Sequence, residues 1–309
     1  MKVLVIGAGA IGSLYGAKLA QAGAQVSIWV RSDAELIKNS GIKIISRTTS
    51  GNEETIFHPH QVLNNLSAES INYDYILIAT KALPDIDLCA LVGDVIQPQT
   101  KIILIQNGIH IEEQLANNYP QHEIISIVAF VAVSRIKAGV VYHQDYGKII
   151  IGAYRKNYLS EAVKELGELW QKAGIEVIFT TNILLERWKK LVWNCAFNPL
   201  SVIAGKKNTQ ELLENPLNRD LIIKIMQEIC ILARADNCEL PTDVIEKNLL
   251  ATEKMKPYKT SMLLDFEANR PMEIEAILGN VVRFAEDKSI PIPYLSTIYA
   301  IISNYKKIN

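Results

Sequence analysis

A row of polar side chains on one apolar segment is the feature of this sequence best suited to chemistry. Residues 186–200 read ERWKKLVWNCAFNPL, in which Lys190, Asn194 and Asn198 stand four residues apart. In a helix this spacing places all three on one face, and the other positions are mostly apolar. A partly buried lysine with a lowered pKa can donate a proton near neutral pH, as the reduction of a carbonyl requires, and two carboxamides can orient a substrate without adding charge. We predict a catalytic lysine and two substrate-binding asparagines in a cleft, the alternative being a structural row of hydrogen bonds.

A glycine-rich loop near the N-terminus predicts a dinucleotide site. The loop GAGAIG follows the apolar run 2–6 and precedes an amphipathic stretch, which is the strand and helix context that this motif requires. Its first glycine allows a tight turn, its second lets the backbone approach a pyrophosphate, and its third packs the helix on the strand. The predicted cofactor-binding residues here are Gly7, Ala8, Gly9, Ala10, Ile11 and Gly12.

The end of the second expected strand favours NADP over NAD. An NAD site usually places Asp or Glu there to bind the ribose 2′-hydroxyl, whereas this chain has Arg31 and Ser32. An arginine can make a charge-assisted contact to the 2′-phosphate of NADP, and a serine can donate its hydroxyl. We expect Asp33 to begin a helix cap. The alternative is that Arg31 is an exposed arginine without a ligand.

Two later strand ends carry polar residues that we also expect to face the cofactor. Thr80 and Lys81 follow the apolar run 75–79, and Gln106, Asn107 and Gly108 follow the run 101–105. Ligands of open α/β sheets bind outside the carboxyl ends of the strands, so we predict that Lys81 and Asn107 contact the cofactor. Asn107 with Gly108 is alternatively an ordinary turn.

The elements that position these residues indicate an α/β fold. Alternating short apolar runs and amphipathic stretches predict an N-terminal, Rossmann-type, doubly wound and mostly parallel sheet over residues 1–179. From about Thr181 the pattern changes to longer helical periods, so residues 180–309 are predicted to form an all-α domain that binds substrate. The expected strands are 2–6, 25–30, 75–79, 101–105, 124–128 and 148–151, and further helices are expected at 221–235 and 274–285.

Composition excludes several classes of partner. With 32 basic and 33 acidic residues, the chain has no strong field that would favour nucleic acid or a membrane surface. Four scattered cysteines without a CxxC pair disfavour a disulfide scaffold or a structural zinc site, and we expect a cytoplasmic setting. His58 and His60 form a metal pair only in principle, so no metal is predicted. The apolar helix 221–235 is a candidate homodimer interface.

Together these residues resemble the ketopantoate reductase (2-dehydropantoate 2-reductase) family. The resemblance rests on Lys190-xxx-Asn194-xxx-Asn198-Pro199-Leu200-Ser201, on the glycine loop with Arg31, on residues 80–81 and 106–108, and on the late segments 260–265 and 273–275. It implies that Lys190 is the general acid and that Glu273 bonds both this lysine and the substrate hydroxyl. It further implies that Asn194, Asn198, Asn208 and Ser261 bind the substrate, Ser261 through the carboxylate. Asn208 is the least distinctive, because the sequence around it, AGKKN, carries no strong motif.

The hypothesis from sequence is therefore an NADPH-dependent reduction of 2-dehydropantoate to pantoate, a step of pantothenate biosynthesis. Without the resemblance, Ser261 reads equally well as a helix N-cap and Glu273 as a surface carboxylate. Two alternatives stay open: reduction of another 2-keto acid, and a non-catalytic NADP-binding sensor. A magnesium-dependent ketol-acid enzyme is disfavoured, because no helix carries clustered Asp and Glu ligands.

Overall fold

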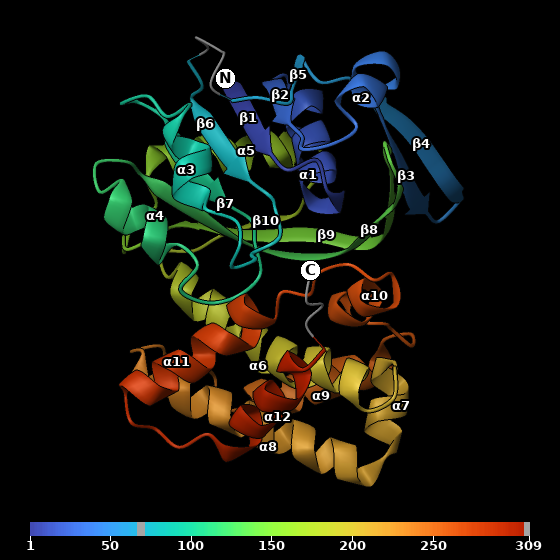
Figure 1. Cartoon of the computed structure of the whole chain (residues 1–309), viewed down its shortest axis with the longest axis vertical. Coiled ribbons are helices and arrows are strands. Elements are labelled where there is room, and N and C mark those ends of the chain that lie inside the picture. The colour runs from blue at the N-terminus through green and yellow to red at the C-terminus, as the bar shows by residue number, and fades with distance from the viewer. Residues whose placement is uncertain (67–71, 306–309) are drawn as a thin grey trace. The chain divides into compact units, whose positions relative to one another are not determined.

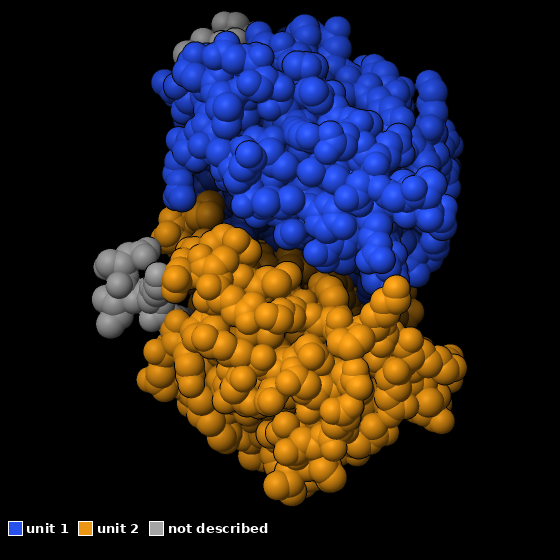
Figure 2. Space-filling model, turned by 90° about the vertical axis from the view of Figure 1, so that its right-hand side faces the viewer, with its two compact units in different colours: residues 1–81, 87–106, 112–183 blue, residues 82–86, 107–111, 184–309 orange. Residues whose placement is uncertain are grey.

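The computed structural model describes residues 1–66 and 72–305 of the chain. They form two compact units, which Figure 2 distinguishes by colour. Unit 1 contains residues 1–81, 87–106 and 112–183, and unit 2 contains residues 82–86, 107–111 and 184–309. Two short segments from the first half of the chain, 82–86 and 107–111, thus group with the C-terminal half.

Unit 1 is built on a mixed, curled sheet in which parallel pairing dominates (Figure 1). The strands run in the order β4-β3-β9-β8-β7-β6-β1-β2-β5, and β10 pairs with β9. Only the β3–β4 and β8–β9 pairings among the described residues are antiparallel. The strands are β1 (Lys2–Ile6), β2 (Gln25–Trp29), β3 (Ile42–Thr48), β4 (Gly51–Phe57), β5 (Gln61–Leu63), β6 (Tyr75–Ile78), β7 (Lys101–Leu104), β8 (Ile124–Lys137), β9 (Val140–Ala153) and β10 (Val177–Phe179).

The central strands of this sheet are buried because their residues are apolar at consecutive positions. Val3 to Ile6 of β1 and Ile76 to Ile78 of β6 have no exposed surface, as expected for parallel strands covered on both faces. Trp170 packs edge-on against Tyr15 and donates a hydrogen bond to the Tyr15 carbonyl oxygen, which ties two helices of the unit together. The helices of unit 1 are α1 (Ala10–Gln21), α2 (Ala34–Ser40), α3 (Leu88–Gly93), α4 (Glu113–Asn118) and α5 (Glu161–Lys172).

Unit 2 is helical and has its own apolar core. Ile109, from the inserted segment 107–111, is fully buried in that core together with Trp188 and Leu191, which explains why the segment groups with this unit. No helix in residues 1–66 and 72–305 is both long enough and apolar enough to cross a membrane. The helices are α6 (Ile183–Ile203), α7 (Thr209–Glu214), α8 (Pro216–Ala235), α9 (Val244–Lys254), α10 (Ser261–Glu267), a π-helical turn η1 (Glu275–Gly279), α11 (Asn280–Asp287) and α12 (Pro293–Ser303).

The predicted fold class is confirmed, and all six expected strands are present. The expected strands at 124–128 and 148–151 are parts of two 14-residue strands, β8 and β9, which pair with each other over most of their length. Four strands were not predicted: β3, β4, β5 and β10. The expected helix 274–285 is divided between the π-helical turn η1 and α11.

Candidate active site

Helix α6 carries the polar row that the sequence predicted. Asn194 and Asn198 are buried, with 7% and 2% of their surface exposed, and Lys190 is partly buried. The apolar positions beside them, such as Leu191 and Phe197, lie in the core of unit 2. Burial of the apolar faces fixes the rotation of the helix, so the three polar side chains are held in place by packing.

The amine of Lys190 is joined to Glu273 through one carboxamide. Lys190 Nζ donates a hydrogen bond to Asn107 Oδ1 at 2.8 Å, and Asn107 Nδ2 donates to Glu273 Oε2 at 2.9 Å. The other carboxylate oxygen, Glu273 Oε1, accepts from the backbone N–H of Ala82 at 3.0 Å. The alternative that Glu273 is a simple surface carboxylate is therefore wrong. Helix α6, the segments 82–86 and 107–111, and the residues just before η1 meet at these four residues.

The surroundings of Lys190 lower the pKa of its amine. Burial, and next the positive charge of Arg187, lower the pKa of Lys190 from 10.5 to about 8, while Glu273 acts in the opposite direction. An amine with this pKa is mostly protonated at neutral pH and is a stronger acid than an exposed lysine. Its properties are those required of a proton donor in this pH range.

The carboxamide of Asn198 has an unused acceptor. Its Oδ1 is buried and accepts no hydrogen bond from the described part of the chain. A buried acceptor without a partner costs about 1–3 kcal/mol, so a ligand that donates a hydrogen bond there would be stabilised by a similar amount. The atom is thus a candidate contact for a hydroxyl group of a substrate.

Ser261 lies at the start of α10 and is exposed. The N-cap of this helix is Thr260, whose hydroxyl accepts from the N–H of Leu263 at 3.1 Å, so the alternative that Ser261 is the cap is wrong. The hydroxyls of Thr260 and Ser201 share a hydrogen bond of 2.7 Å. This bond ties the start of α10 to the last turn of α6 and sets Ser261 near the end of the polar row.

Asn208 is the N-cap of helix α7. Its side chain accepts from the N–H of Glu211 at 3.1 Å, and the Glu211 carboxylate accepts from the N–H of Asn208 at 2.9 Å, which is a capping box for α7. Its Oδ1 is therefore engaged within helix α7. The substrate contact implied for Asn208 stays a prediction.

The geometry of the glycine loop fits a dinucleotide. Gly7 has φ +103°, and a Cβ on Gly12 would lie 2.0 Å from the Gly7 carbonyl oxygen, so neither position accepts a side chain. A Cβ on Gly9, in contrast, would meet nothing within 4 Å. Gly9 is the N-cap of α1, where unpaired backbone N–H groups favour anionic oxygens. The loop thus combines a tight backbone, an open approach and a helix N-terminus.

The end of β2 carries an ion pair beside the predicted phosphate contact. Arg31 and Ser32 are exposed, as a ligand-binding position requires. Asp33 stands at the N-cap of α2, as expected, but its side chain makes no capping hydrogen bond. Its carboxylate pairs instead with Arg135 of β8 and accepts from the Ser32 hydroxyl at 3.2 Å. Arg135 partly neutralises the acidic residue that stands nearest to Arg31 in the sequence.

The two later strand ends meet each other within unit 1. Gln106 Nε2 donates to the carbonyl oxygen of Thr80 at 2.8 Å and to its hydroxyl at 3.1 Å, which joins the ends of β6 and β7. Lys81, next to Thr80, is partly buried. Asn107 uses both ends of its side chain for Lys190 and Glu273, contacts that the sequence did not predict. The cofactor contacts of Lys81 and Asn107 stay predictions.

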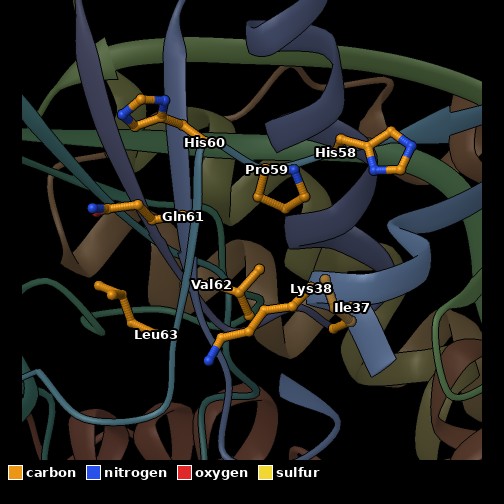
Figure 3. A pocket seen from close by; sticks show the side chains of 8 residues that line it. All are labelled: Ile37, Lys38, His58, Pro59, His60, Gln61, Val62 and Leu63. Atoms are coloured by element: carbon orange, nitrogen blue, oxygen red, sulfur yellow. The ribbon is translucent and has the colours of Figure 1, made fainter. Parts of the chain in front are cut away.

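A separate hollow lies at the edge of unit 1 and contains none of the predicted site residues. It has a volume of about 330 Å³ and is lined by Ile37, Lys38 and residues 58–63 (Figure 3). The rings of His58 and His60 point to opposite sides in Figure 3, so the two histidines do not converge on one ion. No group of three or more metal-ligating side chains exists in the described residues.

Comparison with known proteins gives one consistent family. Residues 3–156 match the profile described as Ketopantoate reductase PanE/ApbA, and residues 182–306 match the profile of its C-terminal part. A 2-dehydropantoate 2-reductase of Nostoc sp. is 32% identical over 302 residues, which cover 96% of this chain and 93% of that protein.

Solved structures agree on the fold. A crystal structure of 2-dehydropantoate 2-reductase from Methylococcus capsulatus is 43% identical, has a TM-score of 0.91 and covers 98% of this chain and 96% of that one. A D-mandelate dehydrogenase in a ternary structure with NADH and anilino(oxo)acetate has a TM-score of 0.85. At 23% identity, with 99% of this chain and 98% of that chain covered, it is similar in fold alone.

Proposed function

The chain belongs to the ketopantoate reductase family, and we propose that it reduces 2-dehydropantoate to pantoate with NADPH, with Lys190 as the proton donor. One observation carries this proposal: a partly buried amine with a pKa of about 8 is hydrogen-bonded to Asn107, which in turn bonds Glu273. Such a lysine is held in one orientation and remains protonated at neutral pH, as proton transfer to a carbonyl oxygen requires.

We assign the cofactor to the loop from Gly7 to Gly12, because this loop leaves room for a dinucleotide beside Gly9 and a helix N-terminus for its pyrophosphate. When bound, NADPH supplies the hydride. Arg31 and Ser32 would receive the 2′-phosphate, and the pairing of Asp33 with Arg135 reduces repulsion of that phosphate. NADH is the competing cofactor, and the ratio of the two dissociation constants tests the assignment.

The residues of unit 2 would bind and protonate the substrate. Nζ of Lys190 would give its proton to the keto oxygen of the substrate, and the neutral amine would then regain a proton from water. The keto oxygen becomes the 2-hydroxyl of the product. Asn194 would orient the substrate, Ser261 would bind its carboxylate, and Asn208 is the least supported member of the set.

Asn198 bears on the choice among 2-keto acids. Its buried and unpartnered Oδ1 requires a donor, and 2-dehydropantoate has a terminal hydroxyl that can supply one. Trimethylpyruvate differs from 2-dehydropantoate only in lacking that hydroxyl oxygen and is the matched control. We expect its kcat/KM to be lower by about five- to a hundredfold, which corresponds to about 1–3 kcal/mol for an acceptor left unpaired.

The decisive experiment measures NADPH consumption with 2-dehydropantoate, trimethylpyruvate, pyruvate, 2-ketoisovalerate and no acceptor. Lys190→Ala should lower turnover by at least about a hundredfold and leave NADPH binding intact. Lys189→Ala is the matched control, because Lys189 lies on the same helix but pairs with Glu186. Near-normal turnover of Lys190→Ala contradicts the proposed role.

The same assay decides between the alternatives. A preference for a 2-keto acid without the hydroxyl supports a different reductase, and the absence of any acceptor-dependent NADPH oxidation supports a binding protein.

We also propose a homodimer through α8, whose Leu217 and Ile231 are 82% and 54% exposed. Sedimentation of the wild type and of Leu217→Lys tests that assignment.

A further inference from the structure

Arg187 is a buried cation on the helix that carries Lys190. It lies three residues before Lys190 on α6, and only 3% of its surface is exposed. Arginine is rarely buried so completely without a specific reason, because removing a guanidinium from water is costly. Residues three apart on a helix are neighbours on its surface, so two positive side chains here share one face.

Both cations hold the same short segment of backbone. Arg187 Nη1 donates to the carbonyl oxygen of Gly108 at 3.1 Å, and Lys190 Nζ donates to the side chain of the preceding residue, Asn107, at 2.8 Å. Arg187 therefore binds the main chain of the segment whose side chain binds Lys190.

The opposite side of this segment is equally constrained. Gly108 has φ +110°, and a Cβ there would lie 2.4 Å from the carbonyl oxygen of Ala276 in the turn η1. The N–H of Ile109 donates to that same carbonyl oxygen at 3.2 Å, and Asn280 Nδ2 donates to the Ile109 carbonyl oxygen at 2.7 Å. The segment is thus held between α6 and the η1–α11 helix, with Arg187 providing a contact on the α6 side.

We propose that Arg187 is a positioning residue for Lys190, which fixes Asn107 through the Gly108 carbonyl and keeps a second positive charge beside the amine. This role rests on the proposed function, since it adjusts the acidity of the proposed proton donor. A lysine beside a second cation gives up its proton more readily than an isolated lysine.

The charged groups around Lys190 agree with this role. Arg187 lowers the pKa of Lys190, Glu273 raises it, and burial lowers it most. On α6 itself, Lys189 is paired with Glu186 at 2.7 Å.

Two further charged groups, one in the segment 107–111 and one in the turn η1, have partners of their own. In the segment 107–111, His110 bonds Asp236 at 2.9 Å, and in the turn η1, Glu275 pairs with Arg283 at 2.8 Å. Arg187 is therefore the positive charge whose removal should change the titration of Lys190.

The test measures the pKa of Lys190 without substrate or cofactor. Full-length protein is labelled with a trace of acetic anhydride over a range of pH, and tandem mass spectrometry quantifies the acetylation of Lys190 and, as an internal control, of Lys189. In Arg187→Gln, which removes the charge, we expect the pKa of Lys190 to rise by about one. Labelling of Lys190 near pH 7 should then fall by about tenfold. Arg187→Lys keeps the charge and should keep the wild-type pKa.

Each result decides the proposal. A wild-type pKa near the ordinary value of lysine overturns it, and so does an Arg187→Gln protein whose Lys190 titrates as in the wild type. Equal shifts in the Gln and Lys variants overturn the role of the charge. Circular dichroism identifies variants that do not fold, and Arg187→Met, of similar length, then replaces the Gln variant. Because the labelling needs no reduction of a keto acid, a protein inactive on 2-dehydropantoate but with the expected shift refutes the proposed substrate and not the role of Arg187.

Discussion

Replacing Lys190 by methionine should make the protein more stable while removing its activity. Methionine has a length similar to that of lysine, fills irregular apolar space and carries no charge. In the folded protein the lysine amine is largely removed from water, near the positive charge of Arg187. A site shaped for catalysis commonly costs stability in this way.

The size of the effect follows from the pKa. Folding lowers the pKa of Lys190 from 10.5 to about 8, and at about 1.4 kcal/mol for each tenfold change in the protonation equilibrium this opposes folding by about 3 kcal/mol at neutral pH. Lys190→Met also removes the hydrogen bond to Asn107, worth about 1 kcal/mol. We therefore expect the variant to be more stable than the wild type by about 2 kcal/mol near pH 7.

The pH dependence gives this prediction its specific signature. Between about pH 8 and 10.5 the folded wild type releases the Lys190 proton while the unfolded chain still binds it, so the stability of the wild type rises with pH in this window. Methionine cannot titrate, and the advantage of the variant should disappear as pH approaches 10.5. Below about pH 8 the difference should be constant.

Urea unfolding followed by tryptophan fluorescence, at about pH 7 and pH 10, measures the stability difference between the variant and the wild type and its dependence on pH. Lys189→Met is the control, because Lys189 forms an ion pair with Glu186 on the same helix and should show no comparable gain. A Lys190→Met protein that is less stable than the wild type at pH 7, or whose stability difference is the same at both pH values, would refute the reasoning.

Four further variants test the cofactor site and the proton donor. Gly9→Ala should keep the melting temperature but weaken NADPH binding, because its methyl group would meet only open space. Gly12→Ala should lower the melting temperature, because its methyl group would lie 2.0 Å from a backbone oxygen. Calorimetry measures the melting temperature, and NADPH fluorescence titration measures the binding. Reduction requires protonated Lys190, and Glu273 raises the pKa of that lysine. Glu273→Gln should therefore move the alkaline limb of the kcat/KM profile to lower pH. A shift to higher pH would contradict the assignment. Arg135→Ala removes the ion pair that neutralises Asp33 after β2, so the Asp33 carboxylate should repel the 2′-phosphate. The variant should therefore bind NADPH more weakly and NADH nearly unchanged, as measured by the two dissociation constants.

Local patterns in the sequence were sufficient to predict the elements with strong periodicity. The apolar runs of β1 and β6 and the loop with glycines at 7, 9 and 12 were recognisable because each signal lies within a few consecutive residues. The same holds for α6, where four-residue spacing was enough to place Lys190 and two asparagines on one face. These features depend on backbone geometry that short segments determine by themselves.

Elements without such a pattern could not be predicted. Strand β4 has six exposed residues out of seven, so it lacks the alternation that marks a half-buried strand, and it forms because β3 offers a pairing edge. Strand β5 has three residues and forms by pairing with β2. Their strand character comes from neighbours that are distant in sequence.

Within the site, the sequence by itself determined which residue types α6 presents, and the tertiary structure decided what they contact. Asn107 was expected at the cofactor, yet its carboxamide bonds Lys190, 83 positions away, and Glu273, 166 positions away. Nothing in the sequence distinguishes Arg187 from the two lysines that follow it, and only the packing of unit 2 shows that it is buried against Gly108. Helical spacing is a local property, whereas burial and hydrogen-bond partners depend on which distant segments the folded core brings together.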